Sequence, residues 1–366
     1  MEINGSRILV TGGCGLIGSA TMEIVASNIL VTGGAGFIGS ELVRQLAARG
    51  ATVTIVDNLV NGKRENLNGL LGGERVQLVE ADVRDSQRMA RLVRGIDIVF
   101  HLACMGVRHS IHSPAESHAV NATATLDLLG LARAAGVGRF VYVSSSEVYG
   151  TARWAPMTEE HPTFPMTVYG AAKLAGECYA RAYHSTYDYP TVVVRPFNSY
   201  GPRCHHEGDS GEVIPKFLLR AMAGLPLVVF GDGTQTRDFT YVEDTARGIL
   251  SCGIAEEASG RTINLGSGRE IAVNELAQRV IEVAGASQAE IVYDRPRPGD
   301  VLRLYADSSQ AREVLGFAPD VTLGEGLARL KDWYLGSGLS AEAQLEGDVV
   351  HNWEVDPGRA KPVGAR

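Results

Sequence analysis

Short apolar runs alternate with amphipathic segments along most of this chain, and this alternation indicates the fold. The runs are rich in Val, Ile and Leu and end in polar residues or glycine, which is typical of buried parallel strands whose carboxyl ends face a site. They are NILV from residue 28, ATVTIVDN (51–58), RVQLVEADV (75–83), GIDIVFHLAC (95–104), VYV (141–143) and TVVVRPF (191–197). Helical segments separate them, including a long one between Pro114 and Gly136. We therefore predict an α/β fold with a doubly wound parallel sheet over residues 28–197.

After residue 197 the pattern changes to longer loops and shorter elements. Helices are predicted at 213–223, from 243, at 273–284 and at 323–334, and strands at 227–230 and 262–265. These elements predict a smaller lobe over residues 198–335, which lies across the carboxyl edge of the sheet and mainly binds the substrate. Residues 336–366 show no sustained period, so we expect a loose C-terminal tail.

A repeat marks the N-terminus. The sequence RILVTGGCGLIGS at residues 7–19 recurs as NILVTGGAGFIGS at 28–40, with 10 of 13 positions identical. Each copy joins an apolar strand to a glycine-rich turn, a pattern that places a pyrophosphate at a helix N-terminus. Only the second copy is followed by a helix and then by a strand that ends in an acid, 24 positions after Gly33. An acid at this distance accepts the ribose 2′-hydroxyl of a dinucleotide, which favours NAD over NADP. The predicted working residues are Gly33, Gly36, Gly39 and Asp57, and residues 1–27 are a duplicated extension of unknown role.

Composition narrows the class of protein. The chain has 366 residues, 45% of them hydrophobic, and a net charge of −8, which argues against non-specific nucleic-acid binding. Its five cysteines lack C-x-x-C spacing, as expected of reduced thiols in a cytoplasmic protein. They are Cys14, Cys104, Cys178, Cys204 and Cys252. Because the sequence shows no secretion signal and no apolar run of membrane-spanning length, we expect a soluble cytoplasmic protein that binds neither a membrane nor nucleic acid.

The stretch Val141–Lys173 carries the most specific candidate chemistry. Three serines, Ser144 to Ser146, follow an apolar strand and can donate hydrogen bonds to a substrate oxygen. Tyr169 and Lys173 are four residues apart, so on a helix they share one face. A lysine ammonium beside a phenol favours the phenolate, which predicts that Tyr169 is a base near neutral pH. Taken alone, the pair is also compatible with an ordinary helix surface.

Eight motifs occur in a fixed order and favour a catalytic role for Tyr169 and Lys173 over an ordinary helix surface. They are TGGAGFIG, ADVRD, HLA, SSSEVYG, YGAAK, RPFNSYGPR, TRDFTYVED and RPGD. Together they resemble the NAD-dependent nucleotide-sugar epimerases and dehydratases of the extended short-chain dehydrogenase/reductase family, over residues 28–335. The resemblance implies a Rossmann-type fold, bound NAD, a nucleotide-diphosphate sugar as substrate and transient oxidation of the sugar at C4. It also implies a homodimer formed through the helices after Pro114 and at Tyr169.

The resemblance assigns roles residue by residue. Tyr169 takes the proton from a sugar hydroxyl, Lys173 holds the nicotinamide ribose, and Ser145 matches the catalytic Ser/Thr. The implied cofactor-binding residues are Gly33, Gly36, Phe37, Ile38, Gly39, Asp57, Asn58, Asp82, Val83, Leu102, Ala103, Tyr169 and Lys173, with Asp82 and Val83 at the adenine. The implied substrate-binding residues are Arg108, Ser145, Asn198, Arg237 and Arg297, the last three at the diphosphate. Leu304 matches the position that limits bulk at C2 of the sugar.

Glu147 leaves the net reaction open. The family's simple 4-epimerases usually carry a small or hydroxyl residue there, whereas 4,6-dehydratases and UDP-glucuronate decarboxylases have an acid that acts at C5. Ser146 stands where one dehydratase group has an aspartate, and TRDFTYVED and RPGD resemble epimerases. We therefore expect an NDP-hexose (UDP-sugar) 4-epimerase, with an NDP-sugar 4,6-dehydratase or a UDP-glucuronate decarboxylase that uses Glu147 as alternatives. Glu147 as a cap on a loop amide also stays open.

The sequence allows two further interpretations. A catalytically silent Rossmann module that binds NAD for regulation is an alternative of another class, but intact Ser145, Tyr169 and Lys173 count against it. The run from Cys204 to Glu207 has the composition of a metal site, yet adjacent histidines rarely bind one ion and the implied chemistry needs no metal. We therefore predict no metal, and we interpret His109 as an ordinary loop histidine.

Overall fold

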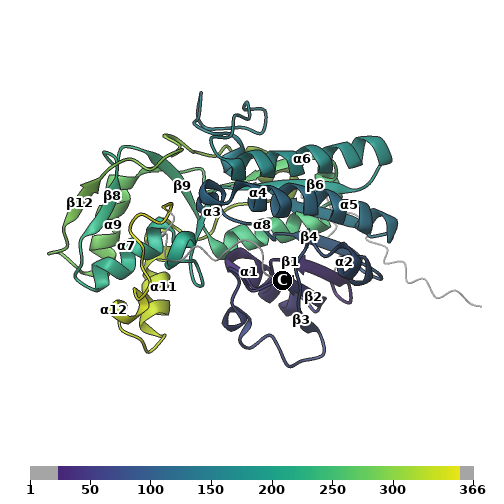
Figure 1. Ribbon diagram of the computed structural model, residues 1–366, viewed down its shortest axis with the longest axis horizontal. Coiled ribbons are helices and arrows are strands. Elements are labelled where there is room, and N and C mark those ends of the chain that lie inside the picture. The colour runs from purple at the N-terminus through teal and green to yellow at the C-terminus, as the bar shows by residue number, and fades with distance from the viewer. Residues whose placement is uncertain (1–23, 355–366) are drawn as a thin grey trace, which may run out of the picture.

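A seven-stranded sheet forms the centre of the molecule in the computed structural model, which describes residues 24–354 without the side chain of residue 209 (Figure 1). Every neighbouring pair of its strands is parallel. Across the sheet the order is β3 (Val76–Glu80), β2 (Thr52–Asp57), β1 (Asn28–Thr32), β4 (Ile98–His101), β5 (Arg139–Val143), β6 (Thr191–Pro196) and β10 (Thr262–Leu265). From β1 the chain adds strands first on one side of the sheet (β2, β3) and then on the other (β4, β5, β6). A binding site is expected outside the carboxyl ends of β1 and β4, where the direction changes. The prediction of a Rossmann-type doubly wound sheet is confirmed.

Helices cover both faces of this sheet. One face packs against α1 (Phe37–Ala48) and α8 (Val242–Ile254), and the other against α2 (Ser86–Leu92), α5 (Ala124–Ala134) and α6 (Val168–Tyr187). Successive residues of a strand point to opposite faces, so Ile29 and Val31 join the first core and Leu30 joins the second. Both cores are apolar, which explains why these strands read as continuous hydrophobic runs.

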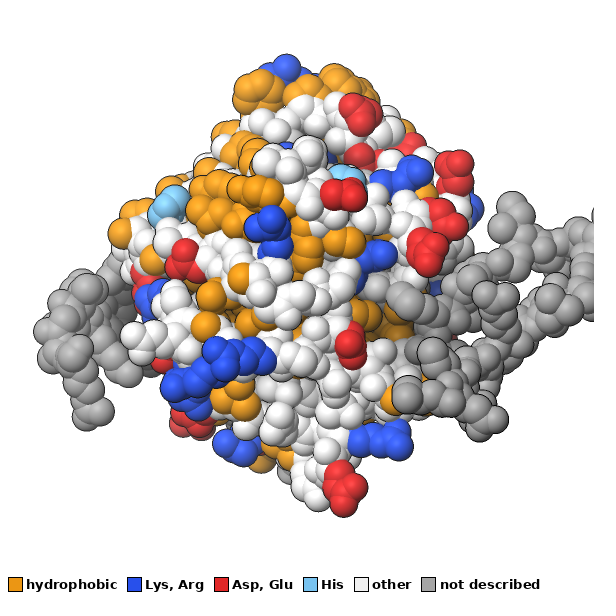
Figure 2. Space-filling model, turned by 90° about the vertical axis from the view of Figure 1, so that its right-hand side faces the viewer, with side chains coloured by type: hydrophobic (Ala, Val, Ile, Leu, Met, Phe, Trp, Pro, Cys, Tyr) orange, Lys and Arg blue, Asp and Glu red, His pale blue; other side chains and the backbone are white. Residues whose placement is uncertain are grey.

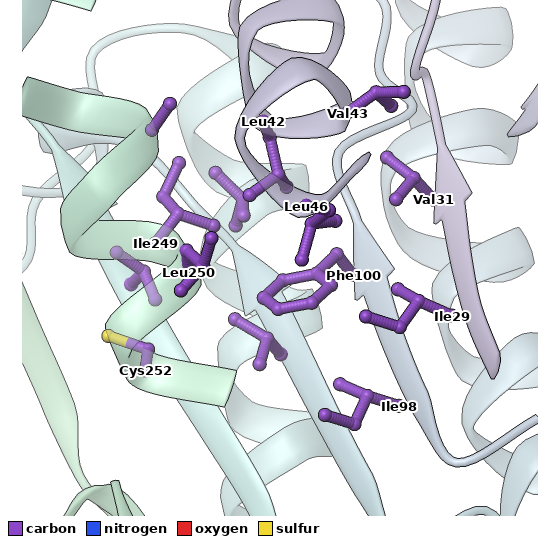
Figure 3. Packing of buried hydrophobic residues seen from close by; sticks show 14 of the residues in the cluster. Ile29, Val31, Leu42, Val43, Leu46, Ile98, Phe100, Ile249, Leu250 and Cys252 are labelled. Carbon is purple, nitrogen blue, oxygen red and sulfur yellow. The ribbon is translucent and has the colours of Figure 1, made fainter. Parts of the chain in front are cut away.

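The first core joins segments that are far apart in the sequence. Figure 3 shows Leu42 and Leu46 of α1 pointing toward Ile249 and Leu250 of α8, with Phe100 of β4 beside them. Each of these side chains is at most 2% exposed. Full burial of one such side chain stabilises the fold by about 1.5–3 kcal/mol.

The smaller lobe is built from short sheets and helices on the left of Figure 1. Its strands are β7 (Asn198–Tyr200), β8 (Leu227–Phe230), β9 (Thr236–Tyr241), β11 (Glu270–Ala272) and β12 (Ile291–Asp294). Its helices are α7 (Val213–Met222), α9 (Val273–Ala284), α11 (Leu323–Leu335) and α12 (Ala341–Gln344). The remaining helices are α3 (Val107–His112), α4 (Pro114–His118) and α10 (Ser309–Leu315), and a π-helical turn (Ala119–Thr123) joins α4 to α5.

The boundary predicted at residue 198 does not hold for the whole segment up to 335. Helix α8 packs on the main sheet with α1, and β10 pairs with β6, from Thr262 opposite Val193 to Leu265 opposite Pro196. The chain therefore returns to the larger domain before it completes the smaller lobe. Sequence reasoning missed this because a buried strand looks the same in either lobe.

The terminal segments also differ from expectation. The first glycine copy lies outside the described residues, but residues 24–27 are part of the fold: Ile24 is 4% exposed, and Ser27 O accepts from Thr52 N at 2.9 Å. The predicted loose tail is wrong for residues 337–354, because α12 packs on α7 and Trp353 is only 5% exposed. The smaller lobe has an apolar edge there, and these residues cover it.

The loop between β5 and α6 projects from the body of the molecule at the top of Figure 1. Its Trp154, Phe164 and Met166 are 50%, 57% and 55% exposed. Figure 2 shows apolar side chains at the top of the molecule, at the height of this loop. None of the helices between residues 24 and 354 is both long and apolar enough to cross a membrane.

Candidate functional site

A cavity of about 480 Å³ opens at the carboxyl ends of the parallel strands and extends into the smaller lobe. Except for Leu304, the residues that the sequence singled out for the cofactor, the catalytic step and the substrate line it. These are Gly33, Gly36, Phe37, Ile38, Gly39, Asp57, Asn58, Asp82, Val83, Leu102, Ala103, Arg108, Ser145, Glu147, Tyr169, Lys173, Asn198, Arg237 and Arg297. Their roles stay predictions, but one cavity brings them together.

The glycine turn after β1 is shaped for close approach of a ligand. Gly33 has φ +71°, and a Cβ there would lie 2.7 Å from the backbone nitrogen of Ala103, so a side chain is excluded. Gly36 precedes the first turn of α1, and no side chain caps that turn. The free N–H groups at the start of the helix and the positive end of its dipole suit a pyrophosphate.

Asp57 ends β2 and holds the glycine turn. Its carboxylate accepts from Ala35 N at 2.9 Å and from Leu59 N at 2.9 Å. Burial raises the pKa of Asp57, and these two backbone hydrogen bonds oppose the rise. An acidic acceptor therefore lies beside the turn, where a ribose hydroxyl would be bound.

Asp82 is oriented by its neighbours at the end of β3. Its carboxylate accepts from both Arg84 and Asn58 Nδ2, and the hydrogen bond from Arg84 contributes most to a pKa of about 2. Asp82 is therefore ionised throughout the physiological range. Asn58 is tied to it at 3.0 Å and so links the ends of β2 and β3.

Helix α6 carries Tyr169 and Lys173 into the cavity wall. The helix begins at Val168, and the hydroxyl of Thr167 caps it by accepting from Gly170 N at 3.2 Å. A Cβ on Gly170 would lie 2.7 Å from the carbonyl oxygen of Glu147, so glycine lets the helix start against the loop that carries Ser145. Lys173 Nζ donates to Val143 O at 2.9 Å, which fixes the end of β5 to the same helix.

The expected lowering of the Tyr169 pKa is wrong for this arrangement. Burial raises the pKa of Tyr169 well above its ordinary value, and a hydrogen bond with Ser145 only partly opposes this. Burial also lowers the pKa of Lys173. Its ammonium lies 6.0 Å from the centre of the Tyr169 ring and donates a hydrogen bond to Val143 O. The phenol is therefore protonated in the protein alone, and a further positive charge is needed to favour the phenolate.

Glu147 lines the cavity, and its carboxylate has no hydrogen-bond partner in the loop. Its backbone N–H donates to Ser145 Oγ at 3.2 Å, so the serine caps the turn and the glutamate does not. Within residues 24–354, no hydrogen bond or ion pair holds its carboxylate. Burial raises its pKa, whereas Arg237, Arg297 and Arg108 act in the opposite direction. The reading of Glu147 as a cap on a loop amide is therefore wrong.

Arg237 and Arg297 come together through a residue that the motif contains but that sequence reasoning did not single out. Asp300 Oδ1 accepts from Arg237 Nη2 at 2.7 Å and from Arg297 Nη2 at 2.6 Å. One carboxylate between two guanidinium groups gives this group of three residues a net positive charge. This arrangement suits the diphosphate of a substrate. Asn198 lines the same cavity, and its Oδ1 is buried without a hydrogen bond among the described residues.

Sequence reasoning missed two further polar residues near the site. Asn121, in the π-helical turn, is fully buried and forms two hydrogen bonds with the backbone of Met105, which lines the cavity. π-helical turns often occur at functional sites, but no sequence pattern marks them. Glu212 precedes α7 and also lines the cavity, where burial raises its pKa to about 7 and Arg108 opposes the rise. A single glutamate at a helix start gives no such signal in the sequence.

The sequence also singled out Leu304, His109 and the five cysteines. Leu304 does not line the cavity: it is fully buried in a cluster with Val148 and Phe197, so it cannot limit bulk at the sugar directly. The interpretation of His109 as a loop histidine is wrong, because it lies on α3, where it lines the cavity and forms a hydrogen bond with Glu116 at 3.0 Å. The four cysteines in the described part of the chain carry free thiols, and Cys14 lies outside it. No group of three metal-ligating side chains occurs among these described residues.

Comparisons with known proteins agree with this geometry. The family model described as GDP-mannose 4,6 dehydratase matches residues 30–330. The UDP-glucose 4-epimerase of Mycolicibacterium smegmatis is 37% identical over 331 residues, which cover 90% of this chain and 98% of the relative.

Two solved structures have the same fold. The UDP-glucose 4-epimerase of Thermotoga maritima, solved with UDP-glucose, is 35% identical with a TM-score of 0.80, and the match covers 85% of this chain and 100% of that one. A dTDP-glucose 4,6-dehydratase of Streptomyces venezuelae, solved with NAD bound, is 36% identical with a TM-score of 0.80 and coverages of 84% and 97%. The chain therefore belongs to the NAD-dependent nucleotide-sugar epimerase/dehydratase family.

Proposed function

We propose that this protein is an NAD-dependent UDP-hexose 4-epimerase. One observation carries the proposal: a single cavity joins the glycine turn, the Ser145–Tyr169–Lys173 group and the arginine pair at Asp300. A nucleotide sugar that lies between these groups has its hexose at Tyr169 and its diphosphate at the arginines. The relatives named above include UDP-glucose 4-epimerases, which supports the choice of substrate.

Ser145, Tyr169, Lys173 and the two arginines each have a separate role in this reaction. Ser145 and Tyr169 hydrogen bond to the C4 oxygen of the hexose, and Tyr169 accepts its proton and later returns it. Lys173 keeps the ends of β5 and α6 together and places its ammonium near that phenol. NAD, when bound, supplies a positive charge that favours the phenolate and accepts the hydride from C4. The positively charged group of residues at Arg237 and Arg297 holds the diphosphate while the oxidised sugar rotates to present its other face.

Ser146 favours epimerisation over 4,6-dehydration. Loss of water from C5 and C6 needs an acid that protonates the leaving hydroxyl group, and Ser146 offers no carboxyl group at that position. It is also 4% exposed, so it contributes little to the cavity surface. Glu147 favours the alternatives, since its unpartnered carboxylate faces the cavity and could remove a C5 proton. We therefore keep dehydration and decarboxylation as outcomes of the test.

The proposal is tested by turnover of UDP-glucose and UDP-galactose with NAD, with the products identified by NMR. We expect interconversion at C4 and no other product. Tyr169→Phe removes the proton acceptor but retains the ring, so turnover falls by about 100-fold or more while NAD binding persists. No reaction with either sugar, or a 4-keto-6-deoxy product, would overturn the assignment.

The proposal also includes a cellular location and an oligomeric state. Free thiols and the lack of a spanning helix in residues 24–354 support a cytoplasmic location. Exposed apolar side chains on the outer helices, such as Leu126 on α5 and Tyr187 on α6, support a homodimer formed through these helices. Light scattering with size-exclusion chromatography tests the dimer, and a monomer at working concentration would contradict it.

A further inference from the structure

Residues 337–354, which we name the strap, form part of the cavity wall although they lie beyond the family match at residues 30–330. After α11 the chain turns through α12, which packs on α7, and then runs back along the smaller lobe. Asp348, Val350 and Asn352 of the strap line the same cavity as Tyr169. The strap is therefore a feature of this chain that the family motifs do not explain.

Specific contacts hold the strap in place. Asp348 forms ion pairs with Lys216 and Arg220 of α7, each at 2.9 Å, and Lys216 Nζ also donates to Val349 O at 2.6 Å. Trp353 packs edge-on against Phe230 of β8, with 4.7 Å between the ring centres. Largely buried ion pairs and an aromatic contact on one short segment indicate a fixed wall rather than a passing contact.

The position of the strap indicates which part of a substrate it meets. This step rests on the proposed function: with the hexose at Tyr169 and the diphosphate at Arg237 and Arg297, the nucleoside extends away from the sheet. The cavity wall in that direction consists of α7, β8 and the strap. The strap therefore meets the base or the ribose and lies on the opposite side of the diphosphate from the glycine turn.

The groups around this end of the cavity suit one kind of base. Asn352 is 5% exposed, and its Nδ2 donates to Gly211 O at 3.1 Å, which leaves the amide oxygen as an acceptor. Phe230 offers a ring surface, and Asp348 positions the ammonium of Lys216 and the guanidinium of Arg220 as donors. Uracil carries a ring N–H between two carbonyl oxygens, so it matches an acceptor flanked by donors. Cytosine has an acceptor nitrogen in place of that N–H.

We propose that the strap determines nucleobase specificity, with Asn352 accepting the ring N–H of a uracil-type base against Phe230. Asp348 is a positioning residue in this account, because it holds Lys216 and Arg220 beside the base. The C-terminal segment thus adds substrate selection to a fold whose catalytic groups all lie on other elements.

The test measures binding of UDP and CDP to the full-length, NAD-loaded protein by isothermal titration calorimetry. We expect UDP to bind at least tenfold more tightly than CDP, and Asn352→Ala to weaken UDP about tenfold while CDP changes little. Glu354→Gln is the matched control: this exposed strap residue pairs with Arg295 and does not line the cavity, so UDP affinity should not change. Melting curves and NAD titrations confirm that each variant is folded.

Other results overturn the inference. Equal UDP affinity in the wild type and in Asn352→Ala, tighter UDP binding by the variant, or a wild-type preference for CDP would each show that Asn352 does not read the base. Because the wild-type base preference needs no substitution, it tests the inference even if Asn352→Ala fails to fold. If UDP binds normally and 4-epimerisation proceeds, loss of this inference leaves the proposed function intact. If no UDP-sugar is turned over, the proposed function fails instead.

Discussion

Removal of the Glu177 charge should strongly destabilise the protein, because this carboxylate is the counter-charge of a buried arginine beneath the site. Glu177 is fully buried on α6, two turns after Tyr169, and it accepts from Arg195 Nε at 2.8 Å, Arg195 Nη2 at 2.6 Å and Ser144 Oγ at 2.6 Å. Glu177→Gln keeps the shape but turns an NH2 toward a guanidinium donor. Removing one partner of a buried pair costs about 3–5 kcal/mol.

The expected shift in melting temperature follows from the size of the fold. Residues 24–354 number 331, and at about 2.1 cal/mol/K per residue the unfolding entropy is about 0.7 kcal/mol/K. The Glu177→Gln variant should therefore melt about 4–7 °C lower, as measured by calorimetry. Turnover should also fall, because Ser144 loses a firm acceptor and the neighbouring Ser145 loses its fixed position.

Two further variants separate this account from a general effect of mutation. Arg181 pairs with the same carboxylate at 3.0 Å, but its side chain is 38% exposed, so Arg181→Ala should lower the melting temperature by only about 1 °C. Replacing both buried partners, as Glu177→Leu with Arg195→Met, leaves no buried lone charge and should restore part of the loss. The reasoning is refuted if Glu177→Gln is as mild as Arg181→Ala, or if the double variant is the least stable of the three.

Three further predictions concern the cofactor, the N-terminus and pH. NAD should bind more tightly than NADP in fluorescence titrations, because Asp57 accepts a ribose hydroxyl and repels a phosphate, and Asp57→Ser should narrow the difference; tighter NADP binding by the wild type would contradict this. Removal of residues 1–23 should leave the melting temperature and turnover nearly unchanged, whereas a cut at residue 27 also removes the buried Ile24 and should lower stability; loss of NAD binding in the shorter deletion would mean that the first glycine copy is needed. Glu212 has a pKa of about 7, so it is neutral below and negative above that pH, and UDP-sugar affinity should fall as the pH rises through 7. Glu212→Gln should make the affinity flat over the same range, and an unchanged slope in that variant would assign the dependence to another group.

Much of the large domain could be predicted because each of its signals is local. The strand that ends in Asp57 and the helix that carries Tyr169 and Lys173 are read from short patterns, and the structure has them at β2 and α6. The order of the motifs along the chain also brought distant residues into one expected site, and all of them except Leu304 line the cavity.

The features that sequence reasoning missed depend on contacts between distant segments. β10 joins the main sheet through pairing with β6, which no local pattern encodes. The strap had no helical or strand period, yet Trp353 and Asp348 fix it to β8 and α7. The raised pKa of Tyr169 follows from burial, whereas the sequence shows only a lysine four positions away.

The exchange of solvent hydrogen into the product tests the central claim most directly. UDP-glucose and, separately, UDP-glucuronate are incubated with the protein and NAD in D2O, and the products are examined by NMR and mass spectrometry. A 4-epimerase returns the same hydride to the other face of C4, so we predict UDP-galactose without carbon-bound deuterium and only a modest effect of Glu147→Gln. Deuterium at C5, or release of CO2 from UDP-glucuronate, abolished by Glu147→Gln, would contradict the account and make Glu147 a catalytic residue at C5.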